Sequence, residues 1–361
     1  MRIMTTRYLF GLVALVLAGC SQVYLTQNED EAIVRIGPYS SKDHGTLPVA
    51  DIAGYYIPYL LLSVRAYGGE QDPGDGWRKL YGMTDERGVP LKERIDSWMK
   101  SWRWVHKGFA EDYLPCSYER IDQGRCRSPV GGLGIHTFVR DDCSEVVVAF
   151  RGTNFDQVDD WFSNLRWFNR LLPLYDQYEQ VQDFAPEIVE VMREECPKRK
   201  SLQLTAVGHS LGGGLAQQMA YASAEVTRVY GFDPSMVTGY YDVDSAARDK
   251  LTSLEIDRVY EHGEVLAYFR YFLRQFAPPA ACNPQIRNIR FDVLKGNLIN
   301  QHSSPALAAK MIAITGSQEQ WQQRQKKYHL PTGSEVSPAN CPATSATSGP
   351  RRATPPPLQR P

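Results

Sequence analysis

The sequence predicts an α/β fold in which a mostly parallel, doubly wound sheet is flanked by helices. Two observations indicate this class. A buried strand, a tight turn and a helix follow one another directly over residues 202–224. Helical and strand-like segments alternate around this unit, which is typical of parallel strands joined by crossover helices. With 361 residues, 43% of them hydrophobic, the chain can bury the core of one large domain.

The amino terminus has the pattern of an export signal. Arg2 and Arg7 precede an apolar run over residues 8–18, which is too short to span a bilayer as a helix. Two charged residues followed by such a run are typical of a secretory signal peptide.

The end of this run indicates a lipid anchor. Residues 17–20 read LAGC, which resembles the lipobox of bacterial lipoproteins. The resemblance implies a signal peptide over residues 1–19, cleavage before Cys20 and acyl chains on that cysteine that hold the protein on a membrane. Ser21, in place of an aspartate, then favours the outer membrane of the bacterial cell envelope. The alternative is an ordinary signal peptide that happens to end in cysteine.

Polar stretches set the expected domain boundaries. Residues 20–49 are polar and irregular, and predict a tether between the lipid and the domain. Residues 50–315 predict one globular domain. Within it, residues 77–130 mix tryptophans with charges and predict an insertion. Residues 316–361 turn to Gln, Pro, Ser and Thr, and predict a disordered tail.

The first elements of the domain can be assigned from periodicity. Apolar residues at roughly helical spacing predict a helix over residues 50–67, broken by Pro58. Residues 134–140 alternate between apolar and polar, and residues 145–150 form a continuous apolar strand. The two strands predict a hairpin that leads into the core.

The central unit reads GHSLG at its turn, over residues 208–212. Glycine at both ends of the turn lets the following helix pass close to the strand, because no Cβ intervenes. The turn therefore places the Ser210 hydroxyl at its apex, beside helix N–H groups that can stabilise an oxyanion. Ser210 is thus a candidate nucleophile; the alternative is a glycine-rich turn with an incidental serine.

The elements around this unit complete the doubly wound pattern. Residues 184–195 predict a helix that leads into the central strand, and residues 228–234 and 258–260 predict two further strands.

Three segments together resemble the fungal-type, or class 3, lipase family of the α/β-hydrolase fold. They are FRGT at residues 150–153, a D-W-x-x-N-L segment at 160–165 and VGHSLGGGLA at 207–216. The resemblance covers about residues 130–310. It implies that Thr153 contributes its N–H, with its hydroxyl in support, to an oxyanion hole. The second N–H comes from Leu211, as the geometry of the turn also requires.

A serine nucleophile needs a base, which in this fold follows the serine in chain order. Three of the seven histidines precede Ser210, and His209 lies in the turn itself. His329 adjoins the low-complexity tail, and His262 lies beside the expected acid. His302 lies in a polar turn ahead of a helix, which is the position that the fold requires. We therefore expect His302 to be the base.

The acid is expected after a later strand. Residues 258–266 resemble the family's acid segment and place Glu264 where the family has an aspartate. Glutamate adds one methylene, which a loop can accommodate, and it serves as the acid in some hydrolases of this fold. Asp233, at the end of the strand after the central helix, is the alternative acid.

These residues predict hydrolysis of carboxylic esters through an acyl-enzyme. The membrane tether and the aromatic segment over residues 161–172 favour a lipid ester, as in a lipase, phospholipase or esterase. That segment is interpreted equally well as a lid or as a core helix. The alternative function is that of a non-catalytic envelope lipoprotein that uses the hydrolase scaffold for binding.

Charge and cysteine spacing limit the other possibilities. The formal net charge of −1 gives no indication of a nucleic-acid partner. No cysteine has C-x-x-C spacing or a neighbouring histidine pair, so we expect no metal site, and we expect no cofactor.

Six cysteines follow Cys20, an even number in an exported chain, so disulfides are expected. Cys116 and Cys126 bracket a short polar span and predict a local bridge. Cys143 and Cys196 each precede a strand, and the family resemblance implies that the two strands are neighbours, so we expect a Cys143–Cys196 bridge away from the active site. Cys282 then pairs with Cys341 or stays free. Separate reduced thiols are the alternative.

Overall fold

The computed structural model describes residues 27–36, 44–68, 72–105, 120–122, 125–126, 133–152, 177–199, 201–240, 242–244, 251, 253–267, 281–282 and 284–328. Several sequence predictions lie outside these residues: the signal peptide, lipidation at Cys20, the oxyanion donor Thr153 and the possible lid at 154–176. The Cys116–Cys126 and Cys282–Cys341 pairs each have at least one member outside them.

The described strands form one large sheet and one small hairpin. They are β1 (Glu31–Ile36), β2 (His44–Pro48), β3 (Trp102–Val105), β4 (Arg120–Asp122), β5 (Arg125–Cys126), β6 (Ile135–Arg140), β7 (Glu145–Phe150), β8 (Gln203–His209), β9 (Val226–Phe232), β10 (Glu255–Glu261), β11 (Ala281–Cys282) and β12 (Gln285–Phe291). The large sheet has the order β2-β1-β12-β10-β9-β8-β7-β6-β3. Its five central strands, from β12 to β7, are parallel, and the strands at both edges are antiparallel. The expected mostly parallel sheet is confirmed.

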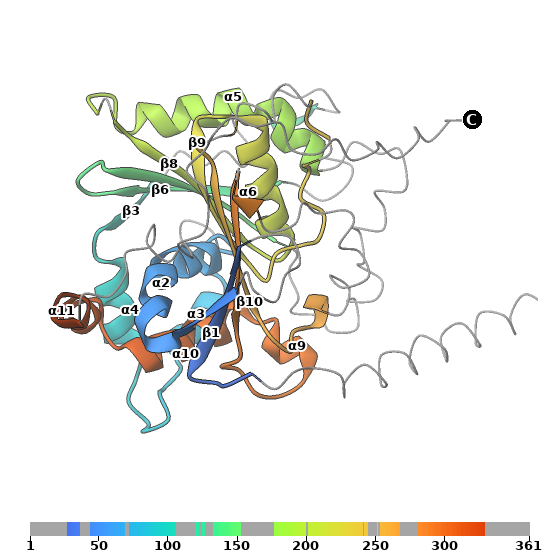
Figure 1. Ribbon diagram of the computed structural model, residues 1–361. Helices are drawn as coiled ribbons and strands as arrows, with labels where there is room; N and C mark the ends of the chain where they lie inside the picture. The colour runs from blue at the N-terminus through green and yellow to red at the C-terminus, as the bar shows by residue number, and fades with distance from the viewer. Residues whose placement is uncertain are drawn as a thin grey trace, which may run out of the picture.

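Helices cover both faces of this sheet (Figure 1). They are α2 (Val49–Arg65), α3 (Asp75–Tyr81), α4 (Lys92–Met99), α5 (Gln177–Glu194), α6 (Leu211–Ala222), α9 (Leu298–Gln301), α10 (Ser304–Thr315) and α11 (Gln318–Tyr328). The helices α2, α4 and α10 bury one face, and α5 and α6 bury the other. No helix in the described part of the chain is long and apolar enough to cross a bilayer.

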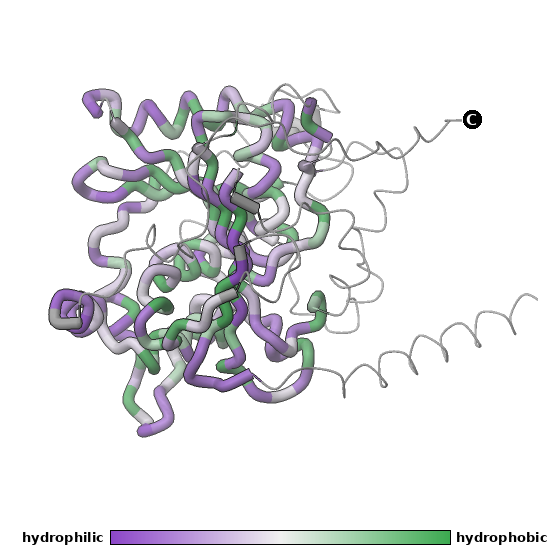
Figure 2. Tube along the Cα trace, in the orientation of Figure 1, coloured by the Kyte–Doolittle hydropathy of each residue, from purple (hydrophilic) through white to green (hydrophobic). Residues whose placement is uncertain are grey.

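The pattern of the central strands explains the two-sided packing. All six residues of β7 are buried. Val147 and Ala149 face the core of α2 and α10, whereas Val146 and Val148 face the core of α5 and α6. A strand that is covered on both faces reads as a continuous apolar run, because each face needs its own apolar set. Figure 2 shows this hydrophobic colour along the central strands.

The predicted tether over residues 20–49 is wrong for its second half. The strand β1 pairs with β12, and β2 pairs with β1, so residues 31–48 extend the sheet. Ala32 and Val34 are buried on alternate positions of β1. Only these two positions show the alternate burial of a strand, and Glu31 and Arg35 flank them. The pattern is therefore too short to be recognised from the sequence.

The predicted insertion over residues 77–130 is wrong in its first part. The strand β3 pairs with β6 in the main sheet, and α4 buries Ile95 and Trp98 in the core. The helix α2 also runs through Pro58 without a break. The hairpin of β6 and β7 is confirmed.

The predicted tail from residue 316 is wrong at its start. The helix α11 is mostly polar, as Figure 2 shows, but its Trp321 is buried against α2. A Cβ at Gly54 of α2 would lie 2.2 Å from the Trp321 ring, so the ring occupies the space that this glycine leaves. One tryptophan anchors a helix that composition alone assigns to solvent.

The predicted bridge between Cys143 and Cys196 is confirmed. The two Cα atoms lie 5.7 Å apart and the cysteines are separated by 53 positions. Cys143 lies just before β7, and Cys196 lies between α5 and β8. The bridge therefore links the segments that lead into the amino ends of two neighbouring parallel strands, β7 and β8. Ser210 lies at the other end of these strands.

We expect the double substitution Cys143→Ser, Cys196→Ser to lower the free energy of unfolding by about 2–4 kcal/mol, since a bridge closing a loop of this size restricts the unfolded chain. Urea unfolding of the two forms measures the difference. At urea concentrations well below the unfolding midpoint of either form, both forms should react equally fast with a fluorophosphonate at Ser210. Equal stability of the two forms would contradict this role for the bridge.

Candidate active site

Ser210 occupies a strained turn between β8 and α6. Its backbone has φ of 57° and ψ of −123°, a region that residues with a Cβ rarely adopt. The Ser210 N–H donates to the carbonyl of Phe232 (2.9 Å), and the Ser235 N–H donates to the carbonyl of Ser210 (2.8 Å). These two bonds tie the turn to β9 and to the loop that follows it.

The glycines of the turn allow this geometry. A Cβ at Gly208 would lie 2.2 Å from the carbonyl oxygen of Gly212, and a Cβ at Gly212 would lie 2.2 Å from that of Phe150. Both contacts are with backbone atoms, which cannot move away as a side chain can. The start of α6 therefore contacts the ends of β7 and β8 directly.

His302 lies between Ser210 and Glu264. Its Nε2 is 3.1 Å from the Ser210 Oγ, and its Nδ1 is 2.7 Å from the Glu264 Oε2. A carboxylate only accepts, so Nδ1 carries the proton and the Nε2 lone pair faces the serine hydroxyl. All three side chains are buried. The structure thus brings the predicted nucleophile, base and acid into one hydrogen-bonded chain.

The loops that carry the acid and the base contact each other. Glu264 follows the end of β10, and its Oε2 also accepts the N–H of Leu266 at 2.7 Å. A Cβ at Gly263 would lie 2.1 Å from the Gln301 Oε1 of α9. His302 ends α9 and precedes α10, whose N-cap is Ser303. The glutamate in place of aspartate is thus accommodated by a short turn packed on the base loop.

His209, which precedes the serine, has a separate function in holding the base loop. Its Nε2 is 2.9 Å from the backbone carbonyl of His302, so Nε2 carries the proton. The Tyr67 hydroxyl is 3.1 Å from His209 Nδ1 and forms a hydrogen bond with it. Sequence reasoning excluded His209 as the base but did not foresee this bridge between the end of α2, β8 and the base.

Asp233 is fully buried at the end of β9. Its Oδ1 accepts the N–H of Glu261 at 2.9 Å, and its Oδ2 lies 3.9 Å from the His209 Nε2. The direct hydrogen bond to the base comes from Glu264 instead. The geometry therefore favours Glu264 over Asp233 as the acid partner of His302.

His209, Asp233 and His302 are close enough together to be considered as ligands of a metal ion. One ligand atom each of His209, Asp233 and His302 lies within 4.8 Å of the other two. However, the His209 Nε2 proton points to a carbonyl, and the two His302 nitrogens face Ser210 and Glu264. A metal ion would displace these hydrogen bonds, so we assign no metal here.

Glu261 is a buried carboxyl group that sequence reasoning missed. Its Oε1 accepts the N–H of Leu294, in the loop after β12, at 3.1 Å. Burial raises the pKa of Glu261 to about 7, against the opposing effect of the backbone N–H groups. Glu261 is the last residue of β10 and lies three positions before Glu264. An acidic residue at the end of a predicted strand was the feature of the sequence that indicated it.

The expected oxyanion donors are described only in part. Leu211 is the first residue of α6, where backbone N–H groups have no partner within the helix. Thr153 lies outside the described residues, but Gly152 before it is described. A Cβ at Gly152 would lie 2.5 Å from the carbonyl oxygen of His209 and 3.3 Å from the N of Gly212. The backbone that leads to Thr153 therefore passes directly beside the turn.

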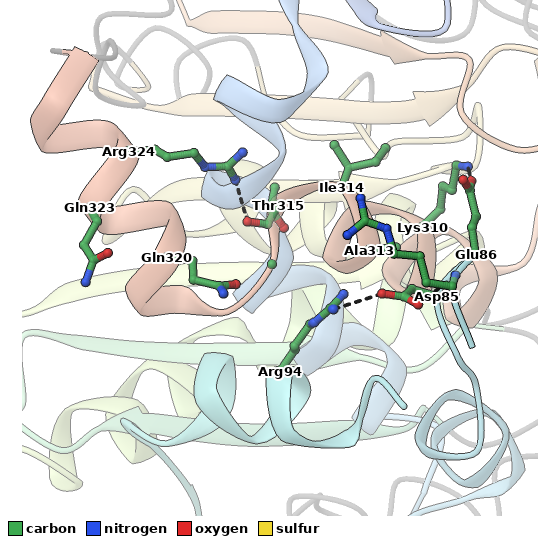
Figure 3. Close-up of a pocket in the computed structure, with 12 residues that line it drawn as sticks. Asp85, Glu86, Arg94, Lys310, Ala313, Ile314, Thr315, Gln320, Gln323 and Arg324 are labelled. Atoms are coloured by element: carbon green, nitrogen blue, oxygen red, sulfur yellow. Dashed lines mark hydrogen bonds and ion pairs between the residues drawn. The ribbon is translucent and has the colours of Figure 1, made fainter. Parts of the chain in front are cut away.

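A cavity of about 660 Å³ lies elsewhere, at the carboxyl end of α10 (Figure 3). It is lined by charged side chains, of which Arg94 pairs with Asp85 and Lys310 with Glu86. His302 precedes the first turn of α10, whereas residues of the last turn of α10 line this cavity. It contains none of the site residues, so the candidate site is assigned from its chemistry and not from cavity size.

Comparisons with known proteins found one family match. Residues 131–274, less than half of the chain, match the family model of a Tle-like phospholipase domain, described as phospholipase-like. No curated protein matches the sequence.

Solved structures with a similar chain trace include three fungal lipases. The lipase of Rhizopus microsporus var. chinensis is 14% identical, with 77% of this chain and 88% of that chain covered and a TM-score of 0.37. The Rhizomucor miehei lipase in its propeptide complex is 12% identical, with 69% and 73% covered and a TM-score of 0.36. The Aspergillus oryzae mono- and diacylglycerol lipase is 13% identical, with 63% and 76% covered and a TM-score of 0.35.

The fold class follows from the sheet and the turn together. A mostly parallel sheet flanked by helices, with a strained serine between β8 and α6 and a matching phospholipase-like model, defines an α/β-hydrolase fold.

Proposed function

We propose that the chain is a serine carboxylic ester hydrolase that cleaves lipid esters through an acyl-enzyme. The observation that supports this most is the buried hydrogen-bonded chain from Ser210 through His302 to Glu264. A serine, an imidazole and a carboxylate in this order are the arrangement needed for nucleophilic acyl transfer.

The geometry suggests the following steps. His302 Nε2 takes the Ser210 proton as the oxygen attacks the acyl carbon, and the Glu264 carboxylate stabilises the resulting imidazolium. The N–H groups of Leu211 and Thr153 bind the oxyanion. His302 then returns the proton to the leaving alcohol. Water, activated by the same base, attacks the acyl-enzyme and releases the acid.

A lipid substrate is the finer part of the proposal. The match to a phospholipase-like model supports it. The lipobox-like residues at 17–20 add a membrane anchor through Cys20, in the outer membrane of a bacterial envelope. An enzyme held on a bilayer has lipid esters at high local concentration.

The substrate class can be tested with the mature protein. We expect release of fatty acid from phospholipid vesicles or from triacylglycerol emulsions, above that from short-chain soluble esters. Hydrolysis of only the soluble esters would remove the lipid part of the proposal. A native protein that neither hydrolyses any ester nor reacts with a fluorophosphonate would favour the binding-scaffold alternative.

Ser210→Ala should abolish ester hydrolysis, with a loss of at least about 10³-fold in kcat, since only oxyanion binding and substrate binding remain. Stability should change little, because alanine keeps the Cβ and the substitution removes only the oxygen that bonds to His302. The exposed Ser201, at the amino end of β8, gives a matched control as Ser201→Ala. Residual activity above about a thousandth of the wild-type value would place the nucleophile elsewhere.

Glu264→Gln should cost more activity than Asp233→Asn. Glutamine can donate to His302 Nδ1 and favour the wrong tautomer, which in a comparable triad lowers kcat by about 10⁴-fold. Measurement of kcat/KM for both variants at equal thermal stability checks the order. The reverse order would move the acid assignment to Asp233.

A further inference from the structure

Asp233 and Glu264 both have carboxylates near the base, and the steps above use only that of Glu264. We propose that Asp233 acts together with Glu264 as a second negative partner of His302, as a positioning residue that stabilises the protonated base. This inference rests on the proposed function, because it concerns the same serine, base and acid.

The topology places both carboxylates at one edge. Asp233 follows β9, and Glu264 follows β10; these strands are parallel neighbours, so their carboxyl ends lie together. A carboxylate oxygen of Asp233 and a ring nitrogen of His302 lie within 4.8 Å of each other, and both side chains are buried. At this distance, and shielded from solvent, a charge interacts strongly with an imidazolium.

The backbone holds Asp233 in this orientation. Its φ is 41°, a left-handed conformation that is uncommon for a residue with a Cβ. The Asp233 N–H donates to the carbonyl of Val259 (2.7 Å), and its Oδ1 accepts the N–H of Glu261 (2.9 Å). One oxygen is thus fixed by β10, which directs the other toward the two histidines.

His209 lies beside both Asp233 and the base. Its Nε2 donates to the His302 carbonyl, and its Nδ1 is 3.1 Å from the Tyr67 hydroxyl. It lies with its centroid 4.8 Å from that of His302, and its Nε2 is 3.9 Å from the Asp233 Oδ2. When Ser210 gives up its proton, a new positive charge forms on His302, whose ring nitrogen lies within 4.8 Å of an Asp233 carboxylate oxygen.

The pH dependence of Ser210 labelling by a fluorophosphonate measures this effect without a lipid substrate. Asp233→Asn keeps the Oδ1 acceptor and removes the charge. We expect the acidic limb of the labelling rate to move to lower pH by about one unit, because the imidazolium loses a stabilising charge, and the plateau rate to fall about tenfold. Asp242→Asn, which removes an exposed charge, should leave both unchanged.

Other titratable groups near the base need a control. They are Glu261 at the end of β10, Glu264 just after it, His209 at the end of β8, and Tyr67, whose hydroxyl bonds to His209. Glu261, whose pKa burial raises to about 7, also changes charge near neutral pH. The comparison is therefore repeated with Glu261→Gln in both proteins, where the shift caused by Asp233→Asn should persist.

A Glu264→Ala background separates the two carboxylates. With Glu264 removed, Asp233 still has a carboxylate oxygen within 4.8 Å of a His302 ring nitrogen, so Asp233→Asn should lower the labelling rate at least as much as it does in the wild type. If Asp233→Asn does not fold, Asp233→Ser keeps a side-chain oxygen for the Glu261 N–H and replaces it in each comparison.

The outcomes are distinguishable. Labelling of Asp233→Asn that superimposes on the wild-type pH profile, in both backgrounds, overturns the second-carboxylate inference and leaves the proposed function standing. Native wild-type protein that does not label at Ser210 overturns the proposed function itself.

Discussion

The close contact between α6 and the ends of β7 and β8 is the constraint on which the rest of the site depends. Backbone atoms occupy the space where side chains at Gly208 and Gly212 would lie, and a Cβ at Gly213 would lie 2.8 Å from Pro234. The helix can therefore start immediately at the strand end. This puts Ser210 in a conformation that costs of order 1–3 kcal/mol, which the packing of β7, β8 and β9 around the turn offsets.

Once the turn is fixed, parallel topology brings the other groups to it. Asp233, Glu264 and the base loop follow β9, β10 and β12, so residues far apart in sequence share one edge of the sheet. Burying so many polar groups is costly unless each is hydrogen-bonded. Backbone N–H groups bind one carboxyl oxygen each of Asp233, Glu261 and Glu264, and a tyrosine hydroxyl and a carbonyl bind the two ring nitrogens of His209. The same bonds fix the distances between the reacting groups.

Different interactions connect the strands at their amino ends, opposite the active site. There the disulfide joins the amino ends of the β7 and β8 region, Arg287 pairs with Asp257, and Glu145 accepts from Thr205. Asp257 also accepts from Tyr56 of α2, so this buried ion pair is hydrogen-bonded on two sides. These stabilising contacts thus lie at one end of the strands and the reactive groups at the other.

The sequence by itself determined the fold class, the strained serine, the hairpin before it and the Cys143–Cys196 pair, because each depends on local patterning or on the order of strands. It also predicted His302 and Glu264 as the base and acid partners of Ser210, and in the structure His302 lies 3.1 Å from the Ser210 Oγ and 2.7 Å from the Glu264 Oε2. Only the tertiary structure decided what depends on long-range pairing: that residues 31–48 extend the sheet beyond β12, and that Trp321 fastens a polar helix to α2. It also decided that His209 donates to the His302 carbonyl, and that Asp233 and Glu261 are buried and bound by backbone N–H groups at the same end of the sheet. The physical reason is that a short strand or a single buried polar residue has too little periodicity to be recognised alone, and its place is set by partners distant in the chain.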